Sequence, residues 1–409
     1  MRLLTLCISA TLLSCVSAKK SCVMPKSKSG GDDTPGIVKA ISQCGNDSSF
    51  WFSAHQTYNL YTPLNLSNLG NVEFLFESNI TIPKNVTEVQ AIVNDTSVYP
   101  GHWITIKGSN IVFKGSGRGG EGWFLAHGEE WWATGNQIAR PHWFSFNGND
   151  LQIMNLNILN PVAWVFSIGG TNIHMKNLVL DARSTNGFPF NTDGVDCSAS
   201  NVLIENFDVA NGDDVINVSP PAQNVTLRNV RAQGSHGISV SCSAGSGGNY
   251  LFENIEISDS LFGARFKGVL GTTCNISDVT WKNMVIKNSS YPIHFIENYV
   301  DQEQPVTGDP SVAAYAKDFT YENIVGTSSN VLEDGSCISD PCWSFTTGQS
   351  PEKAIYLLCN NAEHCKDFHF KGIDLKTPGG KPAGEECIGL NGVTGMGITC
   401  TNGTIIPER

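Results

Sequence analysis

Charged residues are scarce in this chain, and so are patterns that indicate helices. Only 16% of its 409 residues are Asp, Glu, Lys or Arg, and no long apolar segment with a 3.6-residue period occurs beyond the N-terminus. The sequence therefore argues against a helical fold. Stretches rich in Pro or Gly that would separate two domains are also absent, so we expect one elongated domain over residues 19–409.

No segment outside the first residues has the length and hydrophobicity of a membrane span. Residues 1–18 have the form of a secretory signal, with Arg2, an apolar run over 3–16 that is too short to cross a bilayer, and a small-residue cleavage site at Val16-Ser17-Ala18. Asn-x-Ser/Thr sequons agree with secretion, although we expect many of these Asn residues to lie in strands or turns. We therefore expect a secreted, extracellular glycoprotein. The ten sequons begin at Asn46, Asn65, Asn79, Asn85, Asn94, Asn217, Asn224, Asn275, Asn288 and Asn402.

A short repeat runs through the middle of the chain. The segments 172–177, 201–206, 224–229 and 249–254 each begin with Asn, end with Asn five residues later, and alternate apolar with polar residues. The segments 278–283 and 318–323 continue the pattern with Asp in the lead, and 149–155 begins it with one extra residue. Alternation of this kind is typical of a strand with one buried face.

Repeats of 23 to 29 residues that contain several short strands indicate the stacked coils of a solenoid. Parallel stacking places equivalent residues about 4.7–4.9 Å apart, so the recurring Asn side chains can hydrogen-bond to one another at the turns. A β-sandwich is the alternative, but it gives no reason for a recurring Asn-x4-Asn register. We expect an all-β fold, a parallel β-helix, with a short N-terminal helix over 34–43 that caps its open end.

No cysteine spacing fits a zinc site, and we expect disulfides instead. Two of the 13 Cys lie in the predicted signal, which leaves eleven. Cys242 and Cys274 are expected to meet on adjacent coils, which leaves Cys197 as a buried thiol. Proximity in the sequence favours four further pairs, Cys22–Cys44, Cys337–Cys342, Cys359–Cys365 and Cys387–Cys400.

Four polar motifs recur at nearly the spacing of the repeat. The steps from Asp193 to Asp213, from Asp214 to His236 and from His236 to Arg265 span 20, 22 and 29 residues. Each motif alone is an ordinary turn or carries no signal. In repeat register they stack beside one another on one face of the solenoid, which predicts an active site. The motifs are Asn191-Thr192-Asp193, Gly212-Asp213-Asp214, Ser235-His236-Gly237 and Arg265-Phe266-Lys267.

The motifs supply three carboxylates. Carboxylates one coil apart repel, which tends to raise the pKa of one of them. A protonated carboxyl opposite an ionised one is what acid-catalysed glycoside cleavage requires. Because Asp213 and Asp214 are adjacent, both reach one cleft only if the backbone departs from the strand pleat, which Asn211-Gly212 permits.

Two cations complete the set. Arg265 and Lys267 stand on either side of Phe266, so on a strand both cations face outward while the ring points inward. Such a pair is expected to bind an anionic substrate group such as a carboxylate. The net charge of −12 gives no general attraction to a polyanion, so the positive charge that binds an anionic substrate must be confined to the site. We expect neither a nucleic-acid nor a membrane partner.

This ordered set of motifs resembles glycoside hydrolase family 28, the polygalacturonases, which are right-handed parallel β-helices. The match is good over roughly residues 140–299. The resemblance implies that Asp213 is the general acid, that Asp193 and Asp214 activate water for an inverting reaction, and that His236 holds the acid in its working protonation and orientation. It also implies no cofactor or metal, and galacturonate-binding roles for Arg265, Lys267, Tyr299 and Asn191.

One pair of positions departs from the family pattern. The family usually places Cys directly after Gly-Asp-Asp and a partner Cys four residues before the His, whereas this chain has Val215 and Ala232. Both halves of the bridge are missing together, as expected if apolar packing replaces it. Phe266 replaces a more usual Ile at a position that should point inward.

The mode of attack depends on the ends of the cleft. Endo-acting enzymes need a cleft open at both ends, whereas exo-acting enzymes close one end with extra loops. The aromatic-rich stretch 123–143 resembles the closing loop of exo-acting members, with Trp131 and Trp132 expected to wall off one end; a loop that only covers the sheet edge is the alternative. We expect a monomer that hydrolyses the α-1,4-galacturonosyl linkages of pectin from the non-reducing end.

Several alternatives remain open at this stage. Within the family they are an endo-polygalacturonase and a rhamnogalacturonan or xylogalacturonan hydrolase. A pectate lyase shares the solenoid but needs calcium and forms an unsaturated product. A non-catalytic carbohydrate-binding solenoid would have no need for the full acid–base set.

Overall fold

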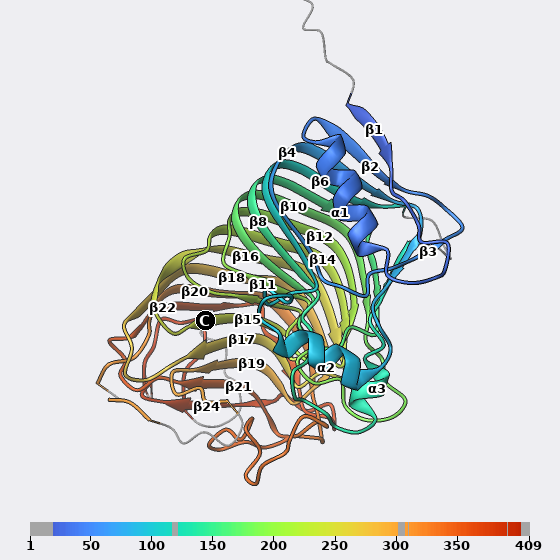
Figure 1. The fold of residues 1–409 in the computed structure, drawn as a ribbon. Helices are drawn as coiled ribbons and strands as arrows, with labels where there is room; N and C mark the ends of the chain where they lie inside the picture. Colours follow the sequence, from blue (N-terminus) through green and yellow to red (C-terminus); the bar gives the residue numbers. More distant parts are fainter. Residues whose placement is uncertain (1–18, 117–121, 302–306, 310, 391, 402–409) are drawn as a thin grey trace, which may run out of the picture.

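The computed structural model describes residues 19–116, 122–301, 307–309, 311–390 and 392–401, so the predicted signal over 1–18 lies outside the described residues. Figure 1 shows parallel strands that stack coil upon coil along one axis. A continuous apolar core runs through the stack from Met24 to Cys400. The predicted parallel β-helix is confirmed.

The strands form three ladders in which each strand pairs in parallel with its equivalent on the next coil. The longest ladder contains β1 (Lys20–Val23), β2 (Ser48–Phe52), β4 (Leu64–Phe76), β6 (Ile104–Gly115), β8 (Phe144–Met154), β10 (Phe166–Asp181), β12 (Ser200–Ala210), β14 (Gln223–Gln233), β16 (Gly245–Ser258), β18 (Cys274–Ser289), β20 (Tyr315–Ser328), β22 (Cys365–Lys371) and β23 (Asp374–Lys376). The second contains β11 (Val195–Cys197), β13 (Ile216–Val218), β15 (Ile238–Cys242), β17 (Phe262–Gly268), β19 (Tyr291–Ile296), β21 (Lys353–Leu358) and β24 (Gly384–Ile388). The third contains β3 (Thr57–Asn59), β5 (Asn79–Thr81), β7 (Trp123–Leu125) and β9 (Asn157–Leu159).

The recurring Asn residues bend the long strands. Each adopts a left-handed backbone, for example φ of 58° at Asn172 and 54° at Asn177, which Asn tolerates better than most residues. Their amides bond along the axis, as between Asn206 Nδ2 and Asn177 Oδ1 at 2.9 Å and between Asn224 Nδ2 and Asn201 Oδ1 at 3.0 Å. The predicted Asn stacking is confirmed.

The first of these repeats differs from the prediction. Asp150, not Asn149, has the left-handed φ of 58° and accepts the amide of Asn172 at 3.0 Å. Asn149 pairs instead with Thr171, in the strand register. The predicted extra residue is therefore wrong: the repeat starts at Asp150 and has the same spacing as the others, because a carboxylate can take the place of the amide oxygen.

Three helices of the described residues lie outside the strand ladders. The predicted capping helix is confirmed as α1 (Thr34–Cys44), which lies beside the first strands of the stack (Figure 1). It has Pro35 in its first turn, and its Ile37 and Ile41 are buried in the core. The others are α2 (Val86–Asn94) and the short α3 (Glu129–Trp132). No helix in the described part of the chain is long and apolar enough to cross a membrane.

All five predicted disulfides are present, and Cys197 is a buried free thiol as expected. Val215 and Ala232, the positions without the usual family bridge, are both buried in the core, so apolar packing does replace it. Phe266 points inward as predicted and stacks on Phe295 with ring centroids 4.4 Å apart.

A row of alternating charges crosses the outer face of the longest ladder. Glu205 lies at its centre and accepts from Arg228 at 2.8 Å, from Lys176 at 3.2 Å and from His174 at 3.0 Å. The hydrogen bond from Arg228 lowers the pKa of Glu205 to about 2, and His174 and Lys176 add to the shift. The row ties three adjacent coils together.

Candidate active site

The second ladder brings the four motifs together. Asp193 lies just before β11, Asp213 and Asp214 lie just before β13, and His236 lies just before β15. Arg265 lies within β17 and pairs in register with Ser239 of β15. Because β11, β13, β15 and β17 are consecutive neighbours, the predicted stacking of the motifs on one face is confirmed.

The Asn211-Gly212 turn sets the two adjacent carboxylates. The amide of Asn211 donates to the carbonyls of Thr192, Asp213 and Asp214 at 2.8, 2.8 and 3.1 Å, and Gly212 N donates to Thr192 Oγ1 at 2.9 Å. A Cβ at Gly212 would meet the Pro189 carbonyl at 2.7 Å. The chain leaves the strand pleat here, as predicted, and Asp213 and Asp214 both face the site.

The three carboxylates lie close together, with one oxygen each of Asp193, Asp213 and Asp214 all within 4.8 Å of one another. Asp214 is fully buried and is neutralised by Lys267 at 2.6 Å and Arg265 at 3.3 Å. Ser239 also donates to it through a short hydrogen bond. The predicted cations therefore lie in the site, each in contact with a carboxylate, and both are buried rather than exposed.

Asp193 is a carboxyl of the site with a raised pKa. Burial raises the pKa of Asp193 well above the usual 3.8, and the neighbouring carboxylates Asp213, Asp196 and Asp214 raise it further. Its Oδ1 is buried and has no hydrogen-bond partner among the described residues. The predicted repulsion between carboxylates thus raises the pKa of Asp193 and not that of Asp213.

Asp196 is a fourth carboxyl of the site that the sequence analysis missed. It lies three residues after Asp193, and burial raises its pKa to about 7, with Asp214 adding to the shift. The side chain faces Asn217, which also accepts from Ser241 at 2.6 Å. The signal was present in the sequence, since Asp196 alternates with inward residues of β11 in the same register as Asn217.

Asp213 is held on two sides. Its Oδ1 lies 3.1 Å from His236 Nδ1, and its Oδ2 accepts the amide of Asn191 at 3.2 Å. Burial alone would raise the pKa of Asp213, but the charge and hydrogen bond of His236, with Lys267 and Arg265, lower it to about 2. The predicted contact between His236 and the presumed acid is present, and Asn191 touches Asp213 directly.

His236 also contacts a residue that the sequence analysis missed. Its Nε2 lies 2.9 Å from Asp334 Oδ2, 98 residues away in the chain. Burial disfavours the imidazolium, but Asp213 and Asp334 raise the pKa of His236 to about 9. No local motif marks Asp334, because it belongs to a segment outside the repeats.

Aromatic rings surround the cations. Arg265 Cζ lies 3.9 Å from the Phe262 ring centroid, 5.2 Å from Trp343 and 5.5 Å from Tyr299, and Lys267 Nζ lies 5.5 Å from Tyr299. Such contacts stabilise a desolvated cation. Tyr299 is therefore placed at the predicted site, beside both cations, and Trp343 is a further ring that the sequence analysis missed.

The four carboxyls, His236, the two cations, Tyr299 and Trp343 line one groove of about 500 Å³. Arg140 enters it from the 123–143 stretch and donates to Asn191 Oδ1 at 2.6 Å and to the Phe190 carbonyl at 2.8 Å. Gln137 and Trp164 also line the groove. Asp301 and Ile338 belong to its lining from later parts of the chain, with Ile338 in the segment between β20 and β21.

The prediction for Trp131 and Trp132 is wrong in detail. Their exposed fractions are 1% and 2%, so neither ring walls the groove. Trp132 packs on Gly128, and its carbonyl lies where a Cβ of Gly187 would stand. Both rings belong to the apolar core and anchor α3, because indole rings bury more favourably than they stand in a polar groove.

Comparisons with known proteins agree with this geometry. A sequence model of glycosyl hydrolases family 28 matches residues 54–346. Two fungal relatives bear the name "Probable exopolygalacturonase C": that of Neosartorya fischeri is 32% identical over 98% of this chain and 96% of its own, and that of Aspergillus fumigatus is 33% identical over 95% and 93%.

Solved structures share the fold. The endo-xylogalacturonan hydrolase from Aspergillus tubingensis superposes with a TM-score of 0.72 at 23% identity, over 94% of this chain and 99% of that chain. The polygalacturonase from Erwinia carotovora superposes with a TM-score of 0.64 at 18% identity, over 88% and 94%. From the match of the family model and the near full-length relatives, the chain belongs to glycosyl hydrolases family 28.

Proposed function

We propose that this protein hydrolyses the α-1,4-galacturonosyl linkages of pectic polygalacturonate, and that it acts from the non-reducing end. The observation that carries the proposal is the meeting of three carboxylates with two buried cations in one groove. Carboxylates on both sides of a bond supply the acid and the base of glycoside hydrolysis, and the cations match the negative charge of a uronate. The relatives named exopolygalacturonases support the same substrate.

Asp213 is the general acid in this proposal, and His236 supplies its proton. In the unliganded site the proton resides on His236, because two carboxylates raise its pKa to about 9. Arg265 and Lys267 are among the groups that hold the pKa of Asp213 down, although burial opposes them. A bound uronate neutralises these cations, which raises the pKa of Asp213 and draws the proton across the 3.1 Å contact.

Asp193 is the general base, with Asp214 orienting the attacking water. Asp193 Oδ1 has no hydrogen-bond partner among the described residues, and a carboxylate with a raised pKa is a stronger base than an ordinary aspartate. Asp214 accepts from Ser239, Arg265 and Lys267, which fixes the orientation of its carboxylate. The binding roles of Tyr299 and Asn191 follow from their contacts with the cations and with Asp213.

The distance between the carboxylates bears on whether the reaction inverts or retains the configuration of the anomeric carbon. The nearest oxygens lie within 4.8 Å, whereas carboxyl groups of inverting glycosidases stand about 6.5–9.5 Å apart. The nearest-atom distance is a lower bound on the group separation, and Asp214 is too heavily hydrogen-bonded to act as a nucleophile. Inversion is proposed because the resemblance to the family implies it, and proton NMR of the first anomer released from a short oligogalacturonide tests it.

The central experiment is a product time course on polygalacturonate, compared with rhamnogalacturonan and xylogalacturonan. Hydrolysis releases reducing sugar without an unsaturated product. Ultraviolet absorbance at the 4,5-double bond, together with loss of activity in EDTA, would identify a calcium-dependent lyase instead. Asp193→Asn serves as the inactive control, and binding without any product would leave a non-catalytic solenoid.

Secretion and a monomeric state complete the proposal. An N-terminus at Lys19 in protein from culture medium would support the signal over 1–18. Asn217 lies in the groove and accepts from Ser241, so a glycan there would block the substrate, and we expect this sequon to stay unmodified. Light scattering tests the monomer.

A further inference from the structure

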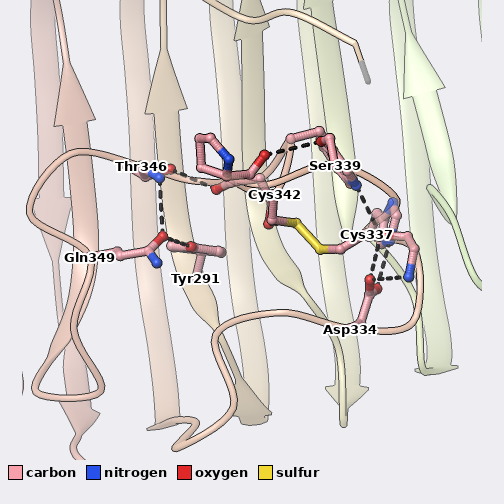
Figure 2. Close-up of a disulfide and its surroundings, with 12 residues drawn as sticks. Tyr291, Asp334, Cys337, Ser339, Cys342, Thr346 and Gln349 are labelled. Atoms are coloured by element: carbon pink, nitrogen blue, oxygen red, sulfur yellow. Dashed lines mark hydrogen bonds and ion pairs between the residues drawn. A yellow bond between two sulfur atoms is a disulfide. The ribbon is translucent and has the colours of Figure 1, made fainter. Parts of the chain in front are cut away.

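One segment outside the repeats folds over the active site. Residues 329–350, which we name the overlying loop, connect β20 to β21. The Cys337–Cys342 disulfide closes its tip, and Gln349 ties its end to the coil stack by accepting from Tyr291 Oη at 2.6 Å and from Thr346 N at 3.1 Å (Figure 2). The loop is therefore fixed both at its tip and at its base.

The overlying loop holds Asp334 in one orientation. Oδ1 accepts from Ser336 N at 2.8 Å and from the Ser336 hydroxyl, and that hydroxyl accepts from Trp343 Nε1 at 3.0 Å. Oδ2 thereby remains directed at His236 Nε2, 2.9 Å away. Gly335 packs against Phe188, where a Cβ would meet the ring at 2.6 Å, so the backbone at this point has little room to move.

His236 has a carboxylate at each ring nitrogen. Asp213 faces Nδ1 and Asp334 faces Nε2, and the imidazole is only 2% exposed. The remaining surroundings are rings: the centroids of Trp343, Phe262 and Phe188 lie 5.2, 6.1 and 6.3 Å away. Two of these rings, Phe262 and Trp343, also contact the guanidinium of Arg265.

We propose that Asp334 is a positioning residue for the proton donor: it fixes His236 with a hydrogen on each nitrogen, so that Nδ1–H always faces Asp213. This inference rests on the proposed hydrolase function. An acceptor at Nε2 stabilises that hydrogen, and the second hydrogen then resides on Nδ1, where it can reach the acid. Without Asp334 the ring loses one of its two hydrogens at lower pH, and a neutral imidazole cannot give its single hydrogen to Asp213 without becoming an imidazolate.

The same contacts extend the pH range over which His236 keeps the proton that it supplies to Asp213. The hydrogen bond and charge of Asp334 contribute, after Asp213, to the raised pKa of His236. Asp334 itself stays ionised, because His236 and Ser336 lower its pKa although burial opposes them. The loop thus lets a buried histidine keep its proton at pH values where an exposed histidine has lost it.

The test compares Asp334→Asn with two conservative variants and one control. Asp334→Asn keeps the shape and removes the charge; Asp334→Glu restores the charge; Ser336→Ala frees Oδ1 but keeps the carboxylate. Asp340→Asn is the matched control, since Asp340 is an exposed aspartate of the same disulfide loop. Equal thermal unfolding midpoints for the variants establish that each one folds.

The first readout does not depend on activity. Nitrogen-15 NMR of histidine-labelled protein, with His236 assigned by its loss in His236→Gln, gives the pKa of the imidazole. Asp334→Asn should lower that pKa by about one unit or more, because a neighbouring opposite charge shifts a pKa by about 1–3 units. Ser336→Ala should give a smaller change, Asp334→Glu should recover most of the shift, and Asp340→Asn should leave the pKa as in the wild type.

The second readout is the pH profile of kcat/KM on polygalacturonate. Asp334→Asn should stay within about threefold of wild type at pH 5, where His236 is charged in both, and fall about fivefold or more at pH 9, where a one-unit decrease in the His236 pKa removes most of the charged form. An equal loss at every pH would reduce Asp334 to a structural support, and an unshifted His236 pKa would overturn the inference. If the wild type releases no galacturonate, the proposed function fails, while the NMR titration still decides the pairing.

Discussion

Lys267 Nζ lies 2.6 Å from Asp214 Oδ2, so the cation expected to bind substrate is already paired with a carboxylate proposed to orient the attacking water. Arg265 contacts the other oxygen of the same group at 3.3 Å. A uronate entering the groove must therefore share these cations with Asp214 instead of finding them free. Substrate binding and the charge state of the catalytic centre are coupled through this contact.

Removal of one cation should consequently affect both binding and turnover. We expect Lys267→Met to lower kcat/KM on polygalacturonate about 100-fold or more, since breaking a buried charge pair costs about 2–5 kcal/mol. KM should rise and kcat should fall together. Steady-state kinetics measure both, with Lys317→Met, at an exposed lysine, as the control. Equal rates of cleavage of polygalacturonate and of methyl-esterified pectin would show that the cations do not bind the substrate carboxylate.

The assignment of the acid can be separated from that of the base by the leaving group. Asp213→Asn and Asp193→Asn should each lower kcat on polygalacturonate by about 100- to 10,000-fold. A nitrophenyl galacturonide needs no proton on its leaving group, so it should restore much of the rate for Asp213→Asn but not for Asp193→Asn. If the nitrophenyl substrate instead restores the rate of Asp193→Asn and not that of Asp213→Asn, Asp193 is the acid and Asp213 is the base.

The pH dependence follows from the same groups. The base must lose its proton, and burial and neighbouring carboxylates raise the pKa of Asp193, so the acid limb of kcat/KM should lie above pH 3.8. The donor must keep its proton, so the basic limb should fall near the His236 pKa of about 9. Asp196→Asn removes one of the charges that raise the pKa of Asp193 and should move the acid limb to lower pH. If the acid limb does not move in Asp196→Asn, the group that titrates in that limb is not Asp193.

Much of this site could be predicted from the sequence, because the repeat converts spacing into position. Asp193, Asp213, His236 and Arg265 stand about one coil apart, and parallel stacking of equivalent strands leaves them no other arrangement. The same logic paired Cys242 with Cys274.

Residues outside the repeat could not be placed in this way. Asp334 reaches His236 through a loop whose path depends on a disulfide, a Gly–Phe contact and side-chain hydrogen bonds. The positions of Trp131 and Trp132 could not be predicted, because an aromatic-rich loop has the same sequence pattern whether its rings line a groove or are buried in the core. The sequence pattern predicts the positions of residues in the repeated coils, whereas the positions of residues in the loops depend on tertiary contacts.

The row of charges on the outer face should contribute stability in a pH-dependent way. Glu205 has a pKa lowered to about 2, so its contribution is full above the unfolded value of about 4.5 and is lost as pH falls toward 2. Glu205→Gln should cost about 1 kcal/mol at pH 7, since its partners are partly exposed to solvent. Urea unfolding should show a smaller cost at pH 3. Glu253→Gln, for which the described residues offer no ion pair within 4.0 Å, is the control.

The mode of attack gives the last prediction, and it concerns Arg140. This guanidinium lines the groove and touches Asn191, which in turn holds Asp213. Arg140 and Gln137 both enter the groove from the 123–143 stretch, which resembles the closing loop of exo-acting enzymes, so we expect a chain terminus to fit where a chain interior does not. We therefore expect monomeric galacturonate as the first product, with viscosity falling slowly as reducing ends appear.

Arg140→Ala should lower the rate of monomer release about tenfold or more, because the terminal uronate loses a cation, and should raise the share of longer products. Lys84→Ala is the matched control: Lys84 is an exposed cation that pairs with Glu130 of α3, outside the groove. Viscosity and reducing ends measured on one sample decide between the modes. Early collapse of viscosity with oligomeric products from the wild type would mean that the groove is open at both ends, and Arg140 would then bind an internal uronate of an endo-acting enzyme.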